Sequence, residues 1–355
     1  MGKLALFNPK DELPQTFEYV DLESVVGTEM LSHRTEIKSS APSRAQRLAC
    51  TGDIFYQTVR PYQKNNYLFE MSDNNYVFST GYAQMRPFVD GYFLFSLIQS
   101  ERFVKVVLDN CTGTSYPAIN VNDLAKIEVA VPSGENEAHK IGTIFRSLDN
   151  LITLHQRKLD HVKDLKKSML QKMFPKNGQL YPEVRFPEFT DAWEQRKLGK
   201  LVDVYSGRDY KHLSEGTIPV YGTGGYMLSV NDALSYDMDA IGIGRKGTID
   251  KPYILKAPFW TVDTLFYAIP KEKVDLNFAF DIFQNIDWKK KDESTGVPSL
   301  SKSAINGIDV LVPKHDEQQI IGRFFACFDH LITLHQRELD HLKLLKKGML
   351  QQMFV

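Results

Sequence analysis

Residues 141–174 read IGTIFRSLDNLITLHQRKLDHVKDLKKSMLQKMF, and residues 321–354 read IGRFFACFDHLITLHQRELDHLKLLKKGMLQQMF. The two segments are identical at 23 of 34 positions, without a gap, at an offset of 180 residues. A weaker similarity lies upstream, where residues 117–132 (PAINVNDLAKIEVAVP) parallel residues 298–313 (PSLSKSAINGIDVLVP). The chain is therefore one unit written twice, with variable front halves and nearly constant back halves. Two copies are too few for a solenoid, so we expect a pseudo-two-fold repeat.

The constant segment predicts a long amphipathic helix in each copy. Between Ile141 and Met173 the apolar residues recur at steps of three and four, which is the spacing of one helix face. Pro175, Asn177 and Gly178 are typical residues to end the first helix. A helix of this length spans roughly 50 Å at 1.5 Å per residue. Because the chain must leave one domain and return from the other, the two helices are expected to be antiparallel, with a domain at each end.

The front halves favour a mixed α/β (α+β) domain in each copy. Short β-branched or aromatic runs bounded by turn residues predict strands. The predicted strands are 52–59, 76–85, 239–243 and 264–269, and the predicted short helices are 88–100 and 276–285. The expected division of the chain is a first α/β domain at 1–133, a first conserved helix at 134–175, a linker and second α/β domain at 176–313, and a second conserved helix at 314–355. Within the third segment, the proline-rich residues 175–192 are expected to form the linker.

Composition narrows the class of protein. The chain has 355 residues, 43% hydrophobic and 25% charged, which is enough for two folded domains and argues against disorder. Its three cysteines form no CxxC pair, which predicts a reduced cytoplasmic protein without a structural zinc site. No signal peptide or membrane span is expected. The net charge of -1 counts mildly against DNA binding, although a local basic groove is compatible with it.

Signatures of catalysis are missing from the sequence. There is no NPP[FY] for base methylation, no Walker A motif, and no HExxH, GxSxG or metal-spaced His/Cys cluster. The 242–248 segment has the wrong spacing for a phosphate-binding loop, and 222–226 lacks the GxGxxG frame. We therefore expect no active site, no metal and no cofactor in this chain.

Cations with hydrogen-bond donors on turns are the remaining candidates for function. Such loops can bring backbone N–H groups close to phosphate while Arg or Lys reaches phosphate or guanine. In the second copy the loop at 245–248 follows a predicted strand, and in the first copy 60–66 takes the comparable place. An ordinary hairpin turn or plain surface charge is the alternative for each, and 221–226 is a further candidate. The candidate DNA-binding residues are Arg60, Tyr62, Lys64, Asn65, Arg208, Lys211, Arg245, Lys246 and Thr248.

Polar residues recur at equivalent positions of the two helices. His155 and His335 lie on the apolar stripe, where we interpret them as a polar layer that fixes the helix register, since metal ligation would need more partners. The paired lysines Lys166, Lys167, Lys346 and Lys347 are interpreted as a solvated face, with DNA phosphate or partner contact as the alternative.

The repeated LITLHQR[KE]LDH[VL]K helix resembles the conserved spacer of the specificity subunit of type I restriction–modification enzymes. Residues 186–198 (FPEFTDAWEQRKL), the string at 245–248 and the GDI…RP string that ends at Pro61 are similar to target-recognition domains of that family. The resemblance covers essentially the whole chain. The first domain departs from the pattern, because residues 13–22 (LPQTFEYVDL) stand where an FPEFTDAW-type opening is expected.

The resemblance implies a non-catalytic DNA-recognition subunit. Two methyltransferase (modification) subunits would bind its helices and supply S-adenosylmethionine chemistry at adenine N6. Two motor and nuclease (restriction) subunits would supply ATP- and Mg²⁺-dependent translocation and cleavage. The expected partner-interface residues are Leu151, His155, Leu159, Leu331, His335 and Leu339.

Other classes of function remain open from the sequence. The first is an orphan DNA-binding protein of the same fold that acts without restriction, which a neighbouring methyltransferase gene would argue against. The second is a single-chain nuclease or methyltransferase, for which the motifs are missing. The third is a coiled-coil adaptor without a DNA role, which a DNA shift assay would separate from the first.

Overall fold

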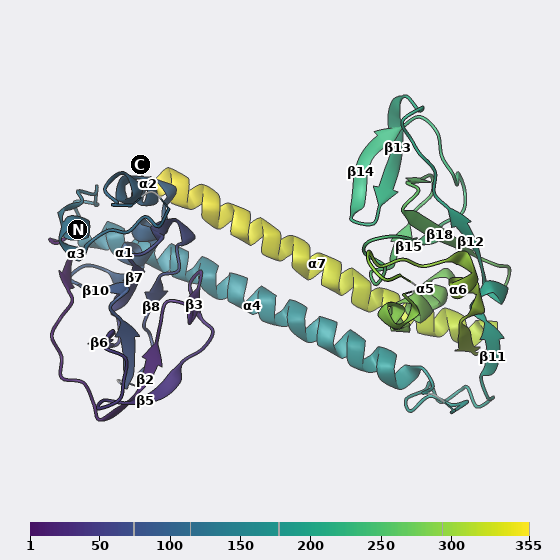
Figure 1. Cartoon of the computed structure of the whole chain (residues 1–355), viewed down its shortest axis with the longest axis horizontal. Coiled ribbons are helices and arrows are strands. Elements are labelled where there is room, and N and C mark those ends of the chain that lie inside the picture. Colours follow the sequence, from purple (N-terminus) through teal and green to yellow (C-terminus); the bar gives the residue numbers. More distant parts are fainter. Residues whose placement is uncertain (74, 114, 177, 293, 355) are drawn as a thin grey trace. The chain divides into compact units, whose positions relative to one another are not determined.

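A computed structural model of the chain describes every residue except 74, 114, 177, 293 and 355. The chain forms two compact units, the first made of Met1–Gln156 with Arg337–Val355 and the second of Arg157–Gln336. Each unit therefore contains one front half together with a part of each long helix. The expected mixed α/β architecture of the front halves is confirmed, and Figure 1 shows their strands and short helices.

Two four-stranded sheets and a small hairpin form the first front half. The first sheet has the order β1–β10–β7–β8 (Ala5–Phe7, Tyr82–Pro87, Ile54–Gln57, Tyr67–Leu68), and all its neighbours are antiparallel. The second has the order β5–β2–β9–β6 (Arg34–Ile37, Thr16–Val20, Tyr76–Ser79, Ala45–Leu48), in which β2 and β9 run parallel. The remaining elements are β3 (Val25–Val26), β4 (Glu29–Met30), the 3-10 turn η1 (Pro61–Gln63), α1 (Gly91–Gln99), α2 (Glu101–Asp109) and α3 (Val121–Lys126).

One predicted strand divides into two. Residues 76–85 form β9 and β10, which belong to different sheets. The break falls at Thr80 and Gly81, where a side chain on Gly81 would collide with Leu22. The prediction of strand structure for this segment was therefore correct, but it did not include the turn that separates the two sheets.

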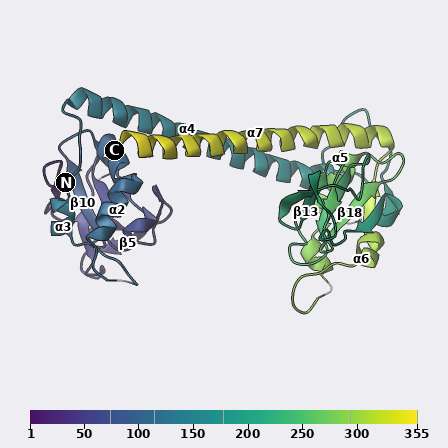
Figure 2. The same cartoon turned by 90° about the horizontal axis from the view of Figure 1, so that it is seen from above.

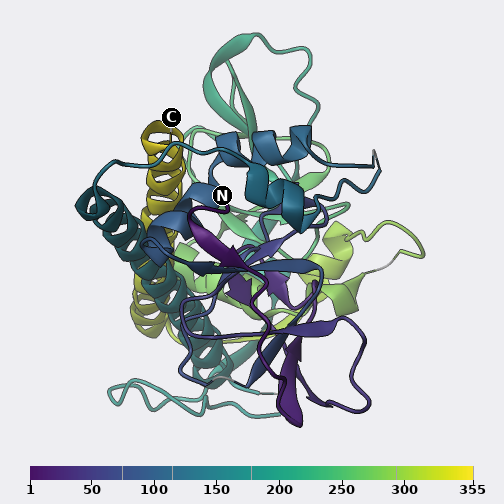
Figure 3. The ribbon, with the colours of Figure 1, turned by 90° about the vertical axis from the view of Figure 1, so that its left-hand side faces the viewer.

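The second front half has a four-stranded core sheet of order β12–β18–β15–β16 (Val202–Ser206, Leu265–Pro270, Ala240–Gly244, Tyr253–Leu255). A second sheet has the order β14–β13–β17 (Gly225–Val230, Glu215–Gly222, Trp260–Thr261), and β11 (Glu194–Lys197) pairs with β19 (Asp309–Val312). The helical elements are η2 (Leu198–Lys200), α5 (Leu276–Asn285), η3 (Trp288–Lys291) and α6 (Lys302–Gly307). Figure 3 shows the β13–β14 hairpin projecting from the rest of this front half.

The predicted linker has no helix or strand among its described residues, yet it is anchored within the second unit. Arg185 donates two hydrogen bonds of 2.8 Å to the carboxylate of Glu317, and the indole N–H of Trp193 donates to the same carboxylate. Glu317 is buried, and its bidentate ion pair with Arg185 compensates for the loss of hydration of its charge. The linker therefore not only connects the first helix to the second front half but also binds to the second unit through this ion pair.

The two long helices appear where the repeat predicts them. α4 spans Glu135–Met173 and α7 spans His315–Met353. α4 ends just before Pro175, as expected, whereas Asn177 lies outside the described residues. None of the helices in the described part of the chain is long and apolar enough to cross a membrane.

Within each unit the two helices run antiparallel and pack through equivalent residues. In the first unit Phe145 of α4 stacks on Phe354, and Phe354 also contacts Phe93 of α1. Figure 2 shows this end of α7 beside the first front half. In the second unit Phe325 and Phe174 make the corresponding contact, 180 residues removed.

A Lys–Asp ion pair between the two helices also occurs once in each unit, and it contradicts the interpretation of these lysines as a solvated face. Lys346 lies 2.5 Å from Asp149 in the first unit, and Lys166 lies 2.6 Å from Asp329 in the second. Lys166 is only 5% exposed, so it is not part of a solvated face, and Lys346 is half-buried. The solvated-face prediction was wrong for these two lysines because each has a carboxylate partner on the opposite helix.

Two helical glycines allow each front half to approach its long helix. Asp90 caps α1 by accepting a hydrogen bond from the Phe93 N–H, and Asp275 caps α5 in the same way. A side chain at Gly142 would collide with the Asp90 carboxylate, and one at Gly322 would collide with that of Asp275. The glycines therefore let a capped helix end dock directly on α4 or α7.

Candidate DNA-reading edges and partner-facing helix residues

Two cationic loops leave the core sheet of the second unit at the same end of its strands. Ser206 at the end of β12 and Ile243 near the end of β15 both pair with Phe266 of β18. The loops that follow these strands carry Arg208 and Arg245, which the structure thus brings to one end of the sheet. Sequence reasoning had named both arginines without a reason to place them together.

The backbone of the Arg245 loop is held by hydrogen bonds on both sides. The Arg245 N–H donates to the Thr264 carbonyl at 2.8 Å, and the Arg245 carbonyl accepts from the Leu300 N–H at 2.9 Å. Gly247 has a φ of +92° and donates to the Pro298 carbonyl at 2.9 Å. A loop fixed in this way presents its side chains with little remaining backbone entropy to lose on binding.

The side chains of this loop are exposed to solvent. Arg245, Lys246 and Thr248 are all exposed. The Arg245 guanidinium carbon lies 5.7 Å from the centre of the Phe266 ring, and its Nη1 makes one long contact of 3.4 Å with the Asp263 carbonyl. Most of its five donors therefore remain available, as a bidentate contact to guanine or phosphate requires.

The Arg208 loop is anchored similarly. The Arg208 N–H donates to the Thr261 carbonyl, and its own carbonyl accepts from the Trp260 indole N–H at 3.0 Å. The Arg208 and Lys211 side chains are exposed, and the described residues give them no ion pair. The two loops of the second unit therefore expose Arg208, Lys211, Arg245 and Lys246, and the two arginines lie just after the ends of the strands.

The β13–β14 hairpin adds exposed aromatic and apolar surface. Tyr226 is 63% exposed and Met227 is 49% exposed. The base of the turn is fixed because the Tyr253 hydroxyl donates to the Gly222 carbonyl at 2.7 Å. The 221–226 segment, a candidate from its sequence, thus lies on a hairpin that projects from the domain (Figures 1 and 3).

The first unit builds its loop on the same frame, in a shifted register. The Ile119 N–H donates to the Thr58 carbonyl, as Leu300 does to Arg245 in the second unit. The Arg60 N–H donates to the Pro117 carbonyl, as Gly247 does to Pro298. The loops are comparable, as predicted, but Thr58 rather than Arg60 stands in the position of Arg245.

Tyr62 is the exposed candidate in the first unit, and Arg60 is half-buried against an aromatic ring. Arg60 has a φ of +53°, and its guanidinium carbon lies 4.4 Å above the Tyr116 ring. Tyr62 is 49% exposed on η1. A positive φ at a non-glycine residue is costly and is often found at functional positions.

Lys64 and Asn65 have internal roles in the structure. The Lys64 ammonium donates to the Gln99 carbonyl at 2.9 Å and to Glu101 at 2.8 Å, and Asn65 accepts from the Gly27 N–H at 2.8 Å. Both side chains therefore tie the loop to neighbouring segments. Their assignment to DNA contact stays a prediction that these interactions make less favourable.

The expected partner-facing residues divide by exposure. Leu151 and Leu331 are each 42% exposed, which suits contact with another protein. Leu159 and Leu339 are each 1% exposed, so their surfaces are already covered within the chain and the prediction was wrong for them. The amphipathic period does not distinguish a face buried inside the chain from one left for a partner.

Further exposed leucines were missed by the sequence reasoning. They are Leu154, Leu165, Leu334 and Leu345, between 37% and 46% exposed, and Leu344, which is 69% exposed. The first four form pairs 180 residues apart, so the repeat itself was the available signal for them, whereas Asp164 stands at the position equivalent to Leu344.

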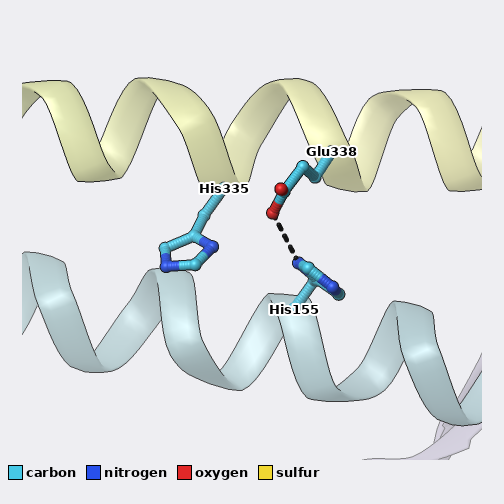
Figure 4. A group of neighbouring side chains, drawn as sticks. All are labelled: His155, His335 and Glu338. Atoms are coloured by element: carbon cyan, nitrogen blue, oxygen red, sulfur yellow. Dashed lines mark ion pairs between the residues drawn. The ribbon is translucent and has the colours of Figure 1, made fainter.

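His155 belongs to a polar contact between the helices of the first unit. Its Nδ1 lies 3.0 Å from the Glu338 carboxylate, which Figure 4 shows as a dashed line. Both His155 and His335 are half-buried. A polar pair on an otherwise apolar seam can specify register, so that role stays our prediction.

Comparisons with known proteins agree with this geometry. The family model described as the type I restriction modification DNA specificity domain matches residues 35–164 and 190–344, once in each copy of the repeat. A type I restriction enzyme MjaVIII specificity subunit of Methanocaldococcus jannaschii is 24% identical over 298 residues, covering 73% of this chain and 68% of the relative. The EcoDI specificity subunit of Escherichia coli is 23% identical over 293 residues, covering 69% and 64%. The chain thus spans about two thirds of the length of these relatives.

Solved structures share the fold. The type I restriction–modification S subunit from M. genitalium superposes with a TM-score of 0.73 at 17% identity, covering all of this chain and 94% of that one. A chain from a study of complex assembly and conformational transition in the type I R-M system gives a TM-score of 0.55 at 19% identity, covering 98% and 95%. The repeated helices, the two front halves and the two family matches lead to one conclusion: the chain belongs to the family of type I restriction–modification DNA specificity proteins.

Proposed function

We propose that the chain is the DNA-recognition subunit of a type I restriction–modification complex, without an active site of its own. Each unit reads one short half-site, and the two half-sites form an asymmetric target with a non-specific gap. The observation that carries this proposal is the pair of anchored loops, one after β7 and one after β15, which use the same frame of backbone hydrogen bonds but carry different side chains.

The asymmetry of the target follows from the divergence of the front halves. The Arg245 loop presents Arg, Lys and Thr, whereas the Arg60 loop presents Arg and Tyr. Arg suits the O6 and N7 acceptors of guanine, and aromatic residues suit stacking or thymine methyl contact. Two different reading surfaces on one repeated frame are expected to select two different sequences.

Partners supply the chemistry in this proposal. Two modification subunits bind the near-equivalent surfaces around Leu151 and Leu331, and restriction subunits complete the complex. S-adenosylmethionine, ATP and Mg²⁺ are expected on those partners. The proposed location is the cytoplasm, where the DNA target is found.

Single substitutions in the two loops test whether these loops recognise DNA bases. In the assembled complex, Arg245→Ala should weaken binding to the specific site by roughly 1–3 kcal/mol, if Arg245 makes a bidentate base contact. It should relax selectivity in one half-site only, and Arg60→Ala should do the same in the other. The assay is competition binding with a library that randomises each half-site in turn.

The control is random DNA at the same salt concentration, since phosphate contacts are strongly salt-dependent. Equal weakening on specific and random DNA would make Arg245 a phosphate contact. An unchanged profile for both variants would remove the two loops from the DNA interface and refute the proposal.

A further inference from the structure

Each unit contains an open recess between its front half and its long helices. The recess of the first unit has a volume of about 510 Å³ and that of the second about 780 Å³. We call them the first and second recess. Each is lined only by residues of its own unit, with α4 and α7 on one side and the front half on the other.

The helical wall of the second recess is repeated within that of the first. The first is lined on α7 by Lys343, Lys346, Lys347, Leu350 and Gln351. The second is lined on α4 by Lys163, Lys166, Lys167, Leu170 and Gln171. Asp329 and Ile332 of α7 complete the second wall, whereas α4 contributes Asp149, Asn150, Ile152 and Thr153 to the first. Every residue that the helices contribute to the second recess thus recurs, as the same residue type 180 positions away, in the first.

The walls from the front halves are different. The first recess is bounded there by Glu70 and Glu101, among others, and the second by Asp250 and Asp287. Two residue types from the front halves are common to both, a glutamine (Gln99 on α1 and Gln284 on α5) and a lysine (Lys64 and Lys251). Most of the shared lining comes from the helices, so a ligand common to both recesses is recognised mainly through the helical wall, and it must be present in two copies.

Of the three lysines in each wall, one is already used. Lys346 is paired with Asp149, and Lys166 is paired with Asp329. The outer lysines, Lys343 and Lys347 in the first recess, are exposed and have no ion pair within the described part of the chain. The same holds for Lys163 and Lys167 in the second recess.

We propose that each recess receives an acidic segment of one modification subunit, whose carboxylates pair with the two outer lysines. This inference rests on the proposed function, which supplies a partner in two copies. The leucine and isoleucine of each wall are partly or fully buried and give the segment an apolar floor. Exposed ammonium groups beside an apolar floor match an acidic residue that has an apolar neighbour.

A DNA backbone fits these walls less well. Duplex DNA carries one negative charge per about 1.7 Å of its axis. The carboxylates of Glu70 and Glu101 in the first recess, and of Asp250 and Asp287 in the second, are each held in an ion pair. The described lining therefore offers such a polyanion little positive charge beyond the unpaired lysines. A protein segment with one or two carboxylates matches these few lysines better than a continuous row of phosphates does.

Charge reversal in one recess at a time tests the proposal. The full-length chain is co-expressed with the modification subunit of its own system, and the mass of the purified complex is measured. The unmodified chain should carry two copies. The pair Lys343→Glu and Lys347→Glu should leave one copy, the pair Lys163→Glu and Lys167→Glu should also leave one, and all four together should leave none.

Matched variants separate charge from damage to the fold. Arginine at the same four positions should keep two copies, because the positive charge remains. Lys140→Glu on α4 with Arg323→Glu on α7 reverses two exposed charges outside the recesses and should also keep two. Circular dichroism should be unchanged for each variant.

The outcomes distinguish this inference from the proposed function. If the unmodified chain binds two copies and the fourfold glutamate variant also binds two, the recesses are not the docking sites and the inference is overturned. If the fourfold variant keeps two copies but loses affinity for DNA, the recesses contact DNA instead, and the inference is again overturned. If the unmodified chain binds no modification subunit, the proposed function itself fails.

Discussion

The repeated Lys–Asp pair provides a stability test with an internal control. All three tryptophans of the chain, Trp193, Trp260 and Trp288, lie in the second unit. Tryptophan fluorescence therefore reports unfolding of that unit, whereas far-UV circular dichroism reports both. Replacing Lys166 by Met removes a nearly buried ammonium from its contacts with Asp329 and Gln284 and leaves the other unit unchanged.

The magnitude follows from the burial of the two partners. Removing one partner of a fully buried ion pair typically costs about 3–5 kcal/mol. The side chain of Asp329 is 38% exposed and keeps part of its hydration, so the expected cost for Lys166→Met is about 2 kcal/mol. With a urea dependence of about 2 kcal/mol per molar, the fluorescence midpoint should fall by about 1 M.

The equivalent change in the first unit is the control. Lys346→Met removes the pair with Asp149, where no tryptophan lies, so the fluorescence midpoint should stay in place while the dichroism midpoint falls. Equal shifts of the fluorescence midpoint in both variants would refute the reasoning that each pair stabilises its own unit. An unchanged midpoint for Lys166→Met would show that the pair contributes no net stability.

Two further predictions concern the helix docking and a buried acid. Ala at Gly142 or Gly322 should destabilise the chain by roughly 1–3 kcal/mol through overpacking, measured by urea unfolding, whereas Ala at Gly348, which has open space, should be neutral or stabilising. Burial raises the pKa of Asp281 well above its usual value, and nearby Lys166 only partly opposes this. The folded state therefore holds the Asp281 proton more tightly than the unfolded state, so stability from this group is lost as pH rises through the folded pKa. Asp281→Asn should remove that loss, and an equal pH dependence of urea unfolding in both proteins between pH 4 and roughly pH 8 would contradict the assignment.

Much of the fold could be predicted because the repeat is explicit. The boundaries of both long helices follow from the apolar period and from Pro175. Their pairing in the structure is visible in the sequence only through the 180-residue offset, which relates Asp149 to Asp329 and Lys166 to Lys346. Lys166 was misjudged because lysine is usually exposed, and its partner lies on a helix 163 residues away.

The candidate site was predicted less completely. A cationic loop is recognisable from its composition, so Arg245 and Arg60 were identified. The alignment of the two loops, in which Thr58 rather than Arg60 corresponds to Arg245, was not predicted. It depends on backbone hydrogen bonds to the carbonyls of Pro117 and Pro298, which have no side-chain signal in the sequence. Whether a side chain such as Lys64 points to solvent or to Glu101 depends on long-range packing that no local pattern encodes.

The central claim is that two unlike reading units on a repeated frame recognise a bipartite target, and methylation mapping tests it most directly. Residues 1–133 are exchanged for the first front half of another family member whose target is known, and the genome of a strain that carries the hybrid complex is mapped for methyladenine. The account predicts that one half-site changes to that of the donor, while the other half-site and the length of the gap stay the same. A continuous or palindromic motif, or a change in both half-sites, would contradict it.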